Sequence, residues 1–410
     1  MRKLISALDV ILLSLMIVSL PSFEAPKNIF LVGYLVTRLI IEIIKFHKVT
    51  KSWERWDSVF VTIVFTALLS TLFSGFQNLD EWRGYKVLLT AILIGWFLSR
   101  SDYTKKQYLL FFQLAVLGIF PPLLWGLYEY LIIHSKINLQ IHSVGHVNHS
   151  AIYLTMIFGA SLSWFISYLN STKRGVIFDW SAIFLGILTL LLFISLIIGQ
   201  SRGAFGISVI LTTAIICLLI KKKNLKILAV GFFTSILILS MSLTPNILKK
   251  HMANQANHNV LAFRDRVWNV SFEAARLNPI LGIGISNWSY LSQDQIKKIV
   301  ERRAEIFNPD KYSFQGHSHS LYLTALVERG IIGLIVTFIF MMAWIYQLKK
   351  TFHWAKKTNE TTYLWGGSFS AWIATFGIGL VNTTFHHEHG ILACIFLGLY
   401  LGYSRCFFKK

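Results

Sequence analysis

Residues 177–226 read IFDWSAIFLGILTLLLFISLIIGQSRGAFGISVILTTAIICLLIKKKNLK. The apolar runs 177–199 and 203–221 in this stretch are each long enough to cross a hydrocarbon core of ~30 Å as a helix. Only Gln200-Ser201-Arg202 separates the two runs, and the second one ends at the first residue of Lys221-Lys222-Lys223. About twelve runs of this kind occur along the chain and use ~250 of its residues. The pattern predicts an all-α polytopic membrane protein.

The composition excludes most soluble classes. Of the 410 residues, 54% are hydrophobic and 14% are charged, whereas about a quarter of the residues in a soluble domain are charged. The formal net charge is +20, which in a soluble protein would suggest a nucleic-acid partner. In a membrane protein it is explained by positive residues that stay in cytoplasmic loops, so we predict a lipid bilayer and no nucleic acid as partner. The three cysteines include no C-x-x-C pair, which argues against a disulfide framework or a zinc knuckle.

Lys and Arg side chains alternate between the connections and so orient the chain. The connections that follow even-numbered spans are rich in them, as at residues 221–226, while the short odd-numbered ones hold few, such as Lys27 and Arg83. By the positive-inside rule, both termini are predicted to be cytoplasmic. The first run follows Met1-Arg2-Lys3 without a small-residue cleavage site and is expected to be retained as a helix. The predicted spans are 4–22, 28–46, 56–75, 82–99, 108–133, 150–170, 177–199, 203–221, 225–243, 321–348, 362–382 and 390–405.

One long connection divides the chain into three parts. Residues 1–243 are expected to form nine transmembrane helices, 244–320 one large outer loop, and 321–410 the last three helices. A structureless loop of this length is uncommon unless it has a function. The loop is basic, with Lys249 among its cations, and contains an amphipathic stretch at Phe263–Leu277 before Asn278-Pro279 and Gly282-Ile283-Gly284. We therefore expect the chemistry on the outer face.

Arginines on that face are candidates for binding an anion. Arg202 lies between two apolar runs beside Gly203, and its guanidinium could aim at a phosphate or extend to the lipid headgroups. Arg264 and Arg266 lie inside the loop, where Arg264 could stack on Trp268 of the same helical face. Alternatively, Asp265 pairs locally with one of the two arginines.

Histidines form three groups on the predicted outer side. Gly316-His317-Ser318-His319-Ser320 stands directly before the tenth span, where the helix dipole keeps an imidazole neutral and available as a base. A helix-capping or interfacial histidine is the alternative. His386-His387-Glu388-His389 offers metal-ligand types, but its spacing matches no closed zinc set. Gly145-His146-Val147-Asn148-His149 precedes the sixth span, where a cap with interfacial histidines is expected.

The tenth span carries the motif that resembles a known family. His319-Ser320, nine residues and then Gly330-x-x-Gly333 is similar to the signature of the bacterial O-antigen ligases, in a superfamily that includes O-antigen polymerases. Ser201-Arg202-Gly203, the Arg264 to Gly284 stretch and Asn148 also resemble that superfamily, and the likeness covers roughly residues 145–400. His317 departs from the pattern as an extra histidine. The Gly330/Gly333 pair is expected to let a neighbouring helix pack closely.

The resemblance implies a fold and a reaction. The fold is a bundle of about twelve transmembrane helices with one large periplasmic loop, glycosyltransferase-C-like, in the bacterial inner membrane. The reaction moves a polysaccharide from undecaprenyl pyrophosphate to a sugar hydroxyl of lipid A–core with inversion. His319 would be the base, with His317 as the alternative, and Arg202 with Arg264 or Arg266 would hold the donor diphosphate. No cofactor is implied, and because the outer loops hold no Asp-x-Asp motif, we expect no metal.

Two other functions remain open from the sequence. An O-antigen polymerase would use the same donor and a second lipid-linked glycan as acceptor. A small-solute transporter would need polar residues along a path across the bilayer, whereas the polar groups here cluster on one predicted face. The glycan repeat, the acceptor sugar and the oligomeric state are not encoded in any motif of the sequence.

Overall fold

The computed structural model describes residues 2–46, 52–73, 76, 78–171, 180–243 and 263–408, and these residues form helices and no strands. The helices of the bundle are α1 (Arg2–Ser19), α2 (Glu24–Phe46), α3 (Arg55–Phe73), α4 (Leu79–Arg100), α5 (Lys105–Leu117), α6 (Phe120–Leu131), α7 (Val147–Ser171), α8 (Trp180–Ile198), α9 (Arg202–Leu219), α10 (Lys223–Leu243), α14 (Leu321–Lys350), the short α15 (Phe352–Ala355), α16 (Asn359–Ile373) with the π-turn η3 (Ala374–Ile378), and α17 (His387–Phe407).

Each of the twelve predicted apolar segments is helical over most of its described residues. The segment 108–133 is divided into α5 and α6, because the prolines that follow Phe120 lack the backbone N–H that would continue α5. Among the described residues, seven helical segments are long and apolar enough to cross a membrane: α3, α5 with α6, α7, α8, α9, α14 and α17. The chain is therefore a multi-pass membrane protein, and its described part is all-helical. Helices α2 and α4 are long enough but not apolar enough to be counted among these seven, because they carry several charged residues.

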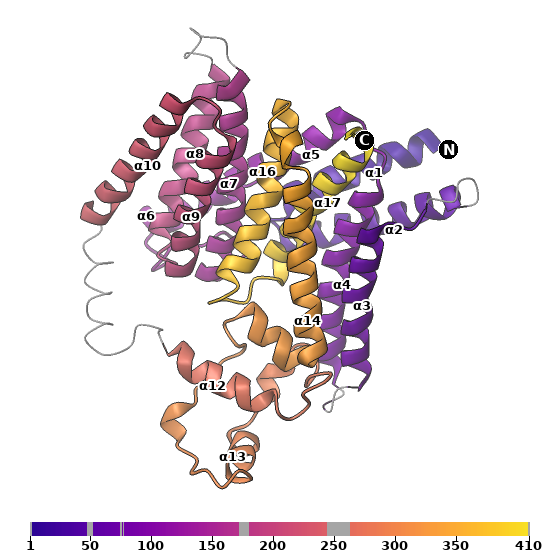
Figure 1. The fold of residues 1–410 in the computed structure, drawn as a ribbon, viewed down its shortest axis with the longest axis vertical. Coiled ribbons are helices and arrows are strands. Elements are labelled where there is room, and N and C mark those ends of the chain that lie inside the picture. Colours follow the sequence, from indigo (N-terminus) through magenta and orange to yellow (C-terminus); the bar gives the residue numbers. More distant parts are fainter. Residues whose placement is uncertain are drawn as a thin grey trace.

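The helices pack side by side into one bundle (Figure 1). Helix α4 packs against α17, α7 against α16 and α3 against α14, while α8 and α9 also lie against α7. The core between them is aromatic, with Tyr34, Tyr108 and Trp344 fully buried. Figure 1 shows α12 (Arg264–Ala274) and α13 (Gln293–Glu301) at one end of the bundle, with both chain termini toward the other.

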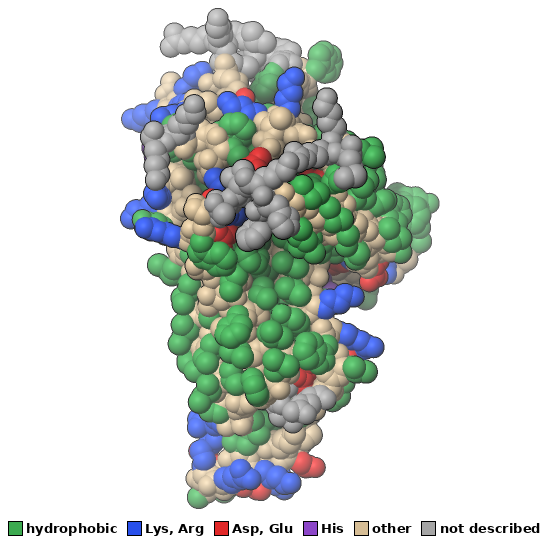
Figure 2. All heavy atoms as spheres, turned by 90° about the vertical axis from the view of Figure 1, so that its right-hand side faces the viewer, with side chains coloured by type: hydrophobic (Ala, Val, Ile, Leu, Met, Phe, Trp, Pro, Cys, Tyr) green, Lys and Arg blue, Asp and Glu red, His purple; other side chains and the backbone are tan. Residues whose placement is uncertain are grey.

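One face of the bundle shows the distribution expected for a lipid-embedded protein. In Figure 2, hydrophobic side chains cover a broad middle zone, and Lys and Arg side chains gather mainly above and below it. Exposed apolar residues such as Val36, Ile40 and Phe65 would be costly in water but are favourable against lipid tails.

The described part of the long connection has its own small core. Val267 and Val270 of α12 pack with Trp288, Ile296 of α13 and, from the bundle, Val327 of α14. The amphipathic stretch predicted at Phe263–Leu277 is confirmed as α12, and its position is fixed against α14. Residues 244–262, including Lys249, lie outside the described residues.

Helix α14 is interrupted at Gly330, which has φ 64° and ψ −166°. The chain segment Asn278–Gly284 docks into the interruption: Ile331 N donates to Pro279 O at 2.9 Å, and Ile283 N donates to Val327 O at 2.9 Å. A Cβ at Gly330 would overlap the carbonyl of Ile280, and one at Gly282 would overlap the Glu328 backbone. The expectation that the Gly330/Gly333 pair admits a neighbouring helix is therefore wrong. Gly330 admits loop backbone, because the broken helix exposes amide and carbonyl groups that the loop satisfies.

Candidate active site

The sequence-predicted site residues stand at the N-terminal ends of helices. Asn148 is the second residue of α7, Arg202 the first of α9 and Arg264 the first of α12, while His317 and His319 directly precede α14. A helix N-terminus carries a partial positive charge and unpaired N–H groups. The arrangement thus adds helix dipoles to the charges of two arginines, which favours an anion.

A hydrogen bond joins the first two of these helix ends. Ser201, the N-cap of α9, donates through Oγ to Asn148 Oδ1 at 3.0 Å. Asn148 in turn donates its backbone N–H to Nδ1 of His146 at 3.2 Å. Asn148 therefore holds the start of α9, and with it Arg202, against α7.

Arg264 interacts electrostatically with both Arg202 and His319. Burial and the nearby guanidinium of Arg202 lower the pKa of Arg264 below its ordinary value. Among the described residues, Arg264 forms no ion pair with a carboxylate. The repulsion between the guanidinium groups of Arg264 and Arg202 shows two positive charges close together, and an oligophosphate would relieve it.

The second arginine of the loop has a different environment. The Arg266 guanidinium lies 4.8 Å from the ring centroid of Phe263, and the expected stacking of Arg264 on Trp268 is not among the cation–π contacts of the described residues. Asp265 is exposed and forms no ion pair with either arginine within the described chain. The geometry thus separates the two candidates, with Arg264 next to Arg202 and His319 and Arg266 packed on an aromatic ring.

His319 is held in an unusual backbone conformation directly before α14. Its φ is 51°, in the left-handed region that few residues other than glycine adopt. Ser320 caps α14 by accepting from Leu323 N at 3.5 Å, and Leu321 N donates to Gly379 O at 2.8 Å. These contacts with the turn after α16 fix the imidazole at the helix start.

The electrostatic surroundings keep His319 neutral. Burial and the charge of Arg264 lower its pKa below the usual value for histidine, while a hydrogen bond with the side chain of Asn382 acts in the opposite direction. Asn382 is itself buried. A neutral imidazole with an amide partner is able to accept a proton from a substrate hydroxyl.

His317 lies next to His319 but is more strongly shielded. The two rings are 4.1 Å apart between centroids, and His317 Nδ1 accepts from the backbone N of His319 at 3.2 Å. Burial and the adjacent His319 lower the pKa of His317 to about 3. Because Nδ1 is engaged with the backbone and lies 3.4 Å from Thr383 Oγ1, His317 supports the conformation of the loop.

The three predicted histidine groups meet in space. The His149 ring lies 4.8 Å from His386, 5.3 Å from His389 and 5.5 Å from His146, and His386 lies 6.4 Å from His317. Within the described part of the chain, no three His, Cys, Asp or Glu side chains are arranged to hold a metal ion. The ring contacts extend from His319 at the start of α14 to α7 and α17.

Glu388 does not join that cluster as a ligand. It forms a buried ion pair with Lys27 of α2, one of the few cations of the predicted outer connections. A buried pair of this kind is costly to break on one side, because the remaining charge is left in an apolar surrounding. Glu388 and Lys27 therefore tie α17 to α2.

Sequence reasoning missed the turn that follows α16. Asn382 and Thr383 contact His319 and His317, although they are far from both in the sequence. The available signal was the polar run Asn382-Thr383-Thr384, all three buried, between two apolar segments. No sequence motif indicated that His149 and His386 would lie close together, because their proximity depends on the packing of α7 beside α17.

Comparison with known proteins gives a consistent assignment. Residues 187–338 match the O-antigen ligase family, and this range includes Arg202, Arg264, His317, His319 and Gly330. The exopolysaccharide production protein ExoQ of Rhizobium meliloti is 29% identical over 93 residues, which is 22% of this chain and 20% of that protein. The chain thus matches about a fifth of the length of this curated relative.

The matched range coincides with the part of the fold that carries the site. It begins within α8, continues through α9 and the loop with α12, and ends within α14 past the interruption at Gly330. The family expected from the His319-Ser320 and Gly330-x-x-Gly333 motif is confirmed. The chain therefore carries an O-antigen ligase family domain, in which Arg202, Arg264 and His319 come together at one end of the helix bundle.

Proposed function

We propose that this protein is an O-antigen ligase, a glycosyltransferase of the bacterial inner membrane with its active site on the periplasmic face. It transfers polysaccharide from undecaprenyl pyrophosphate to a sugar hydroxyl of lipid A–core. The observation that carries the proposal is the placement of His319 beside Arg264, and of Arg264 beside Arg202. A base next to an excess of positive charge suits attack by a hydroxyl on a donor whose leaving group is a diphosphate.

The proposed reaction is a single displacement. The acceptor hydroxyl loses its proton to the neutral imidazole of His319 as its oxygen bonds to the anomeric carbon. The bond from that carbon to the diphosphate breaks, and undecaprenyl pyrophosphate leaves with the electron pair. Attack from the face opposite the leaving group inverts the anomeric centre, by the logic of inverting glycosidases.

Arg202 and Arg264 stabilise the leaving diphosphate. Their guanidinium groups bind phosphate oxygens in bidentate fashion, and the N-termini of α9 and α12, at which the two arginines stand, add partial positive charge. A bound diphosphate also offsets the field of Arg264 at His319, so the imidazole becomes a stronger base once the donor is in place. The arginines supply the electrostatic role that a divalent metal has in other enzymes, and we propose that transfer is metal-independent.

The same site supports a second candidate function. ExoQ is named for exopolysaccharide production, which favours the reading that this chain joins lipid-linked repeat units as a polymerase. The base and the arginines would have unchanged roles, and only the acceptor would differ. The gathering of the site at one end of the bundle favours either enzyme over the small-solute transporter.

Reconstituted transfer tests the proposal. The full chain in lipid vesicles is supplied with an undecaprenyl-pyrophosphate-linked glycan, lipid A–core and excess EDTA, and we expect glycan on lipid A–core. Longer lipid-linked glycan in place of that product would assign a polymerase. His319→Ala should lower the rate by about 10²–10⁴, while the exposed His142 near the same end gives a matched control, His142→Ala, with normal rate. An active His319→Ala with an inactive His317→Ala would transfer the role of base to His317.

A further inference from the structure

A second cluster of charged and aromatic residues lies at the end of the bundle opposite α12. The sequence Trp53-Glu54-Arg55-Trp56-Asp57, which leads into α3, combines two aromatic with three charged side chains. The end of α4, the end of α14, α15 and the end of α17 meet it there, and they enclose a cleft of about 930 Å³. This volume lies within the range of small-molecule sites in proteins.

The inner wall of the cleft is a fixed polar network around two arginines. Arg100 Nη1 lies 3.0 Å from Glu54 Oε1 and 3.3 Å from Asp57 Oδ2. Asp57 is buried and also accepts from Trp96 Nε1 at 2.6 Å. The carboxylates therefore hold the start of α3 to the end of α4.

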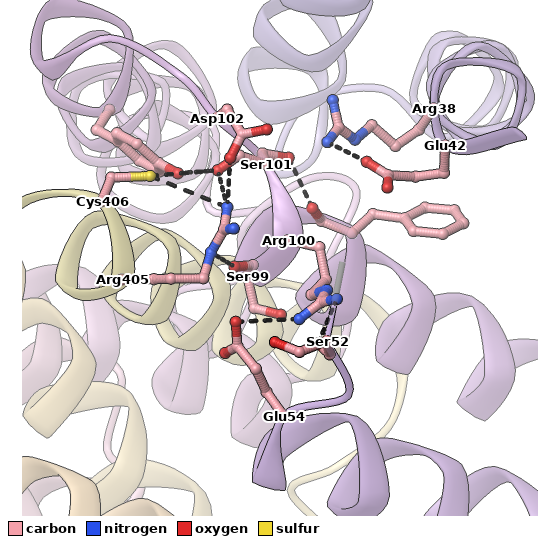
Figure 3. A network of polar contacts seen from close by, with 12 residues as sticks. Arg38, Glu42, Ser52, Glu54, Ser99, Arg100, Ser101, Asp102, Arg405 and Cys406 are labelled. Atoms are coloured by element: carbon pink, nitrogen blue, oxygen red, sulfur yellow. Dashed lines mark hydrogen bonds and ion pairs between the residues drawn. The ribbon is translucent and has the colours of Figure 1, made fainter. Parts of the chain in front are cut away.

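Arg405 extends the network to α17 mainly through hydrogen bonds to backbone carbonyl groups. Its Nε donates to Ser99 O at 3.1 Å, and its Nη2 donates to Ser101 O at 2.7 Å and to Asp102 Oδ1 at 2.8 Å. Figure 3 shows Arg100 and Arg405 in one network of polar contacts. Both guanidinium groups are thus oriented before any ligand arrives, which reduces the entropy lost on binding.

Cations without such partners line the outer part of the cleft. Arg55 and Lys350 are exposed there, and neither forms an ion pair with a carboxylate of the described residues. Glu54 and Asp57 are engaged with Arg100. The lining therefore keeps a net positive charge that suits an anion.

Aromatic side chains surround these cations. Trp53 is 64% exposed, and Trp354 stacks on Phe408 with 5.0 Å between ring centroids. Tryptophan next to basic residues at the ends of membrane-spanning helices is typical of the headgroup level of a bilayer. Helices α3, α14 and α17, whose ends form the cleft, are candidate membrane spans, so the cleft opens where lipid headgroups lie.

We propose that this cleft binds the phosphate-bearing headgroup of an anionic phospholipid. The phosphodiester lies against Arg55 and Lys350 at the mouth, with Arg100 and Arg405 behind it, and the glycerol and acyl chains contact Trp53 and Trp354. Basic pockets between transmembrane helices on the cytoplasmic side bind acidic headgroups by the same physical chemistry. A soluble phosphate would use the cations but would make no apolar contact with the exposed ring of Trp53. The proposal is independent of the transfer reaction.

Lipid binding to the purified full chain in detergent tests the proposal. The probes are phosphatidylglycerol, phosphatidylethanolamine and sn-glycerol 3-phosphate, and the readouts are the dissociation constant from native mass spectrometry and the shift in Tm. The test variant is Arg55→Gln with Lys350→Gln. The control is Lys222→Gln with Lys223→Gln, two exposed lysines at the start of α10, which Figure 1 shows at the same end of the bundle.

We expect wild type and control to bind phosphatidylglycerol in preference to phosphatidylethanolamine. The test variant should bind phosphatidylglycerol roughly 30-fold more weakly, because it lacks two basic residues that each attract an anionic lipid by ~1 kcal/mol. Equal binding of the two lipids by the wild type would overturn the proposal, as would equal losses in both double variants. Stabilisation by sn-glycerol 3-phosphate that matches that by phosphatidylglycerol would assign the cleft to a soluble anion instead.

Discussion

The guanidinium groups of Arg202 and Arg264 have a geometric role as well as a charge. A planar fork matches phosphate oxygens in pairs, which an ammonium does not. We therefore expect Arg202→Lys and Arg264→Lys each to lower the rate of glycan transfer, by up to about 10²–10³. The rate of transfer from a lipid-linked donor at saturating acceptor measures the loss.

Arg266 provides the matched control, because its guanidinium packs over Phe263. Arg266→Lys keeps the charge and should leave transfer within a few-fold of wild type. Full activity in both Arg202→Lys and Arg264→Lys would identify these residues as interfacial anchors and remove them from the anion site.

The partly buried histidines make the stability of the protein depend on pH. His317, His319 and His386 all have pKa values below that of an unfolded histidine, each mainly because of burial. Below pH ~6.5 the unfolded chain binds protons at these positions that the folded chain does not bind. Stability is therefore lost as the pH falls from ~6.5 toward the pKa of about 3 for His317.

Thermal unfolding in nanodiscs between pH 7.5 and 5 measures this loss. Tm should fall with pH, and His317→Gln should reduce the slope because one proton-linked group is gone. His142→Gln, at an exposed position, should leave the slope unchanged. Identical slopes in wild type and His317→Gln would show that His317 is not shielded from protonation.

At the scale of elements, the interruption of α14 gives the sharpest prediction. Gly330 combines a positive φ with backbone of Ile280 where a side chain would begin. Gly330→Ala should lower the free energy of unfolding by about 3 kcal/mol, because it adds backbone strain and displaces the docked loop. Unfolding in denaturant followed by tryptophan fluorescence measures the change.

Gly206 of α9 is the control for that substitution. A Cβ at this position meets no atom within 4 Å, and its φ is not positive. Gly206→Ala should change the free energy of unfolding by no more than about 1 kcal/mol. Equal effects of the two substitutions would mean that the interruption of α14 does not depend on Gly330.

Sequence patterns predicted the elements better than their interruptions. Long apolar runs are a local signal, so each predicted segment is helical over most of its described residues. The interruption at Gly330 requires a loop segment from Asn278 to Gly284 that is distant in sequence, and no periodicity within α14 reports it. The site shows the same limit. A local motif identified His319, but its partner Asn382 lies in the turn between α16 and α17, which is distant in sequence. The different surroundings of Arg264 and Arg266, one near Arg202 and the other over Phe263, also had no signal in the sequence.

At the scale of the whole molecule, we propose that all twelve segments cross the membrane. Helix α4 is more charged than a typical span, yet it runs the length of the bundle. At one end Arg100 reaches Glu54, and at the other Asn78 Nδ2 donates to Asn287 Oδ1 at 2.6 Å. Helix α4 thus joins the end that carries the cleft to the end that carries α12 and α13.

Cysteine labelling tests this topology. In a background without the three native cysteines, a membrane-impermeant maleimide should label Asn308→Cys and Ser135→Cys from outside intact spheroplasts. Asp102→Cys and Lys222→Cys should be labelled only after permeabilisation. All four positions lie in connections between the proposed spans. Labelling of Asp102→Cys from outside would show that α4 does not cross the membrane.

The interruption of α14 also constrains the order in which parts of the fold assemble. The segment that completes its hydrogen bonds, Asn278–Gly284, precedes α14 in the chain and leaves the ribosome first. In the proposed topology this segment is translocated ahead of α14. The outer part of α14 therefore waits with unpaired amide groups until the exported loop folds back onto it. Assembly of the end that carries α12 is thereby a late event of biogenesis, and a premature stop before residue 321 leaves an exported loop that has lost its docking partner.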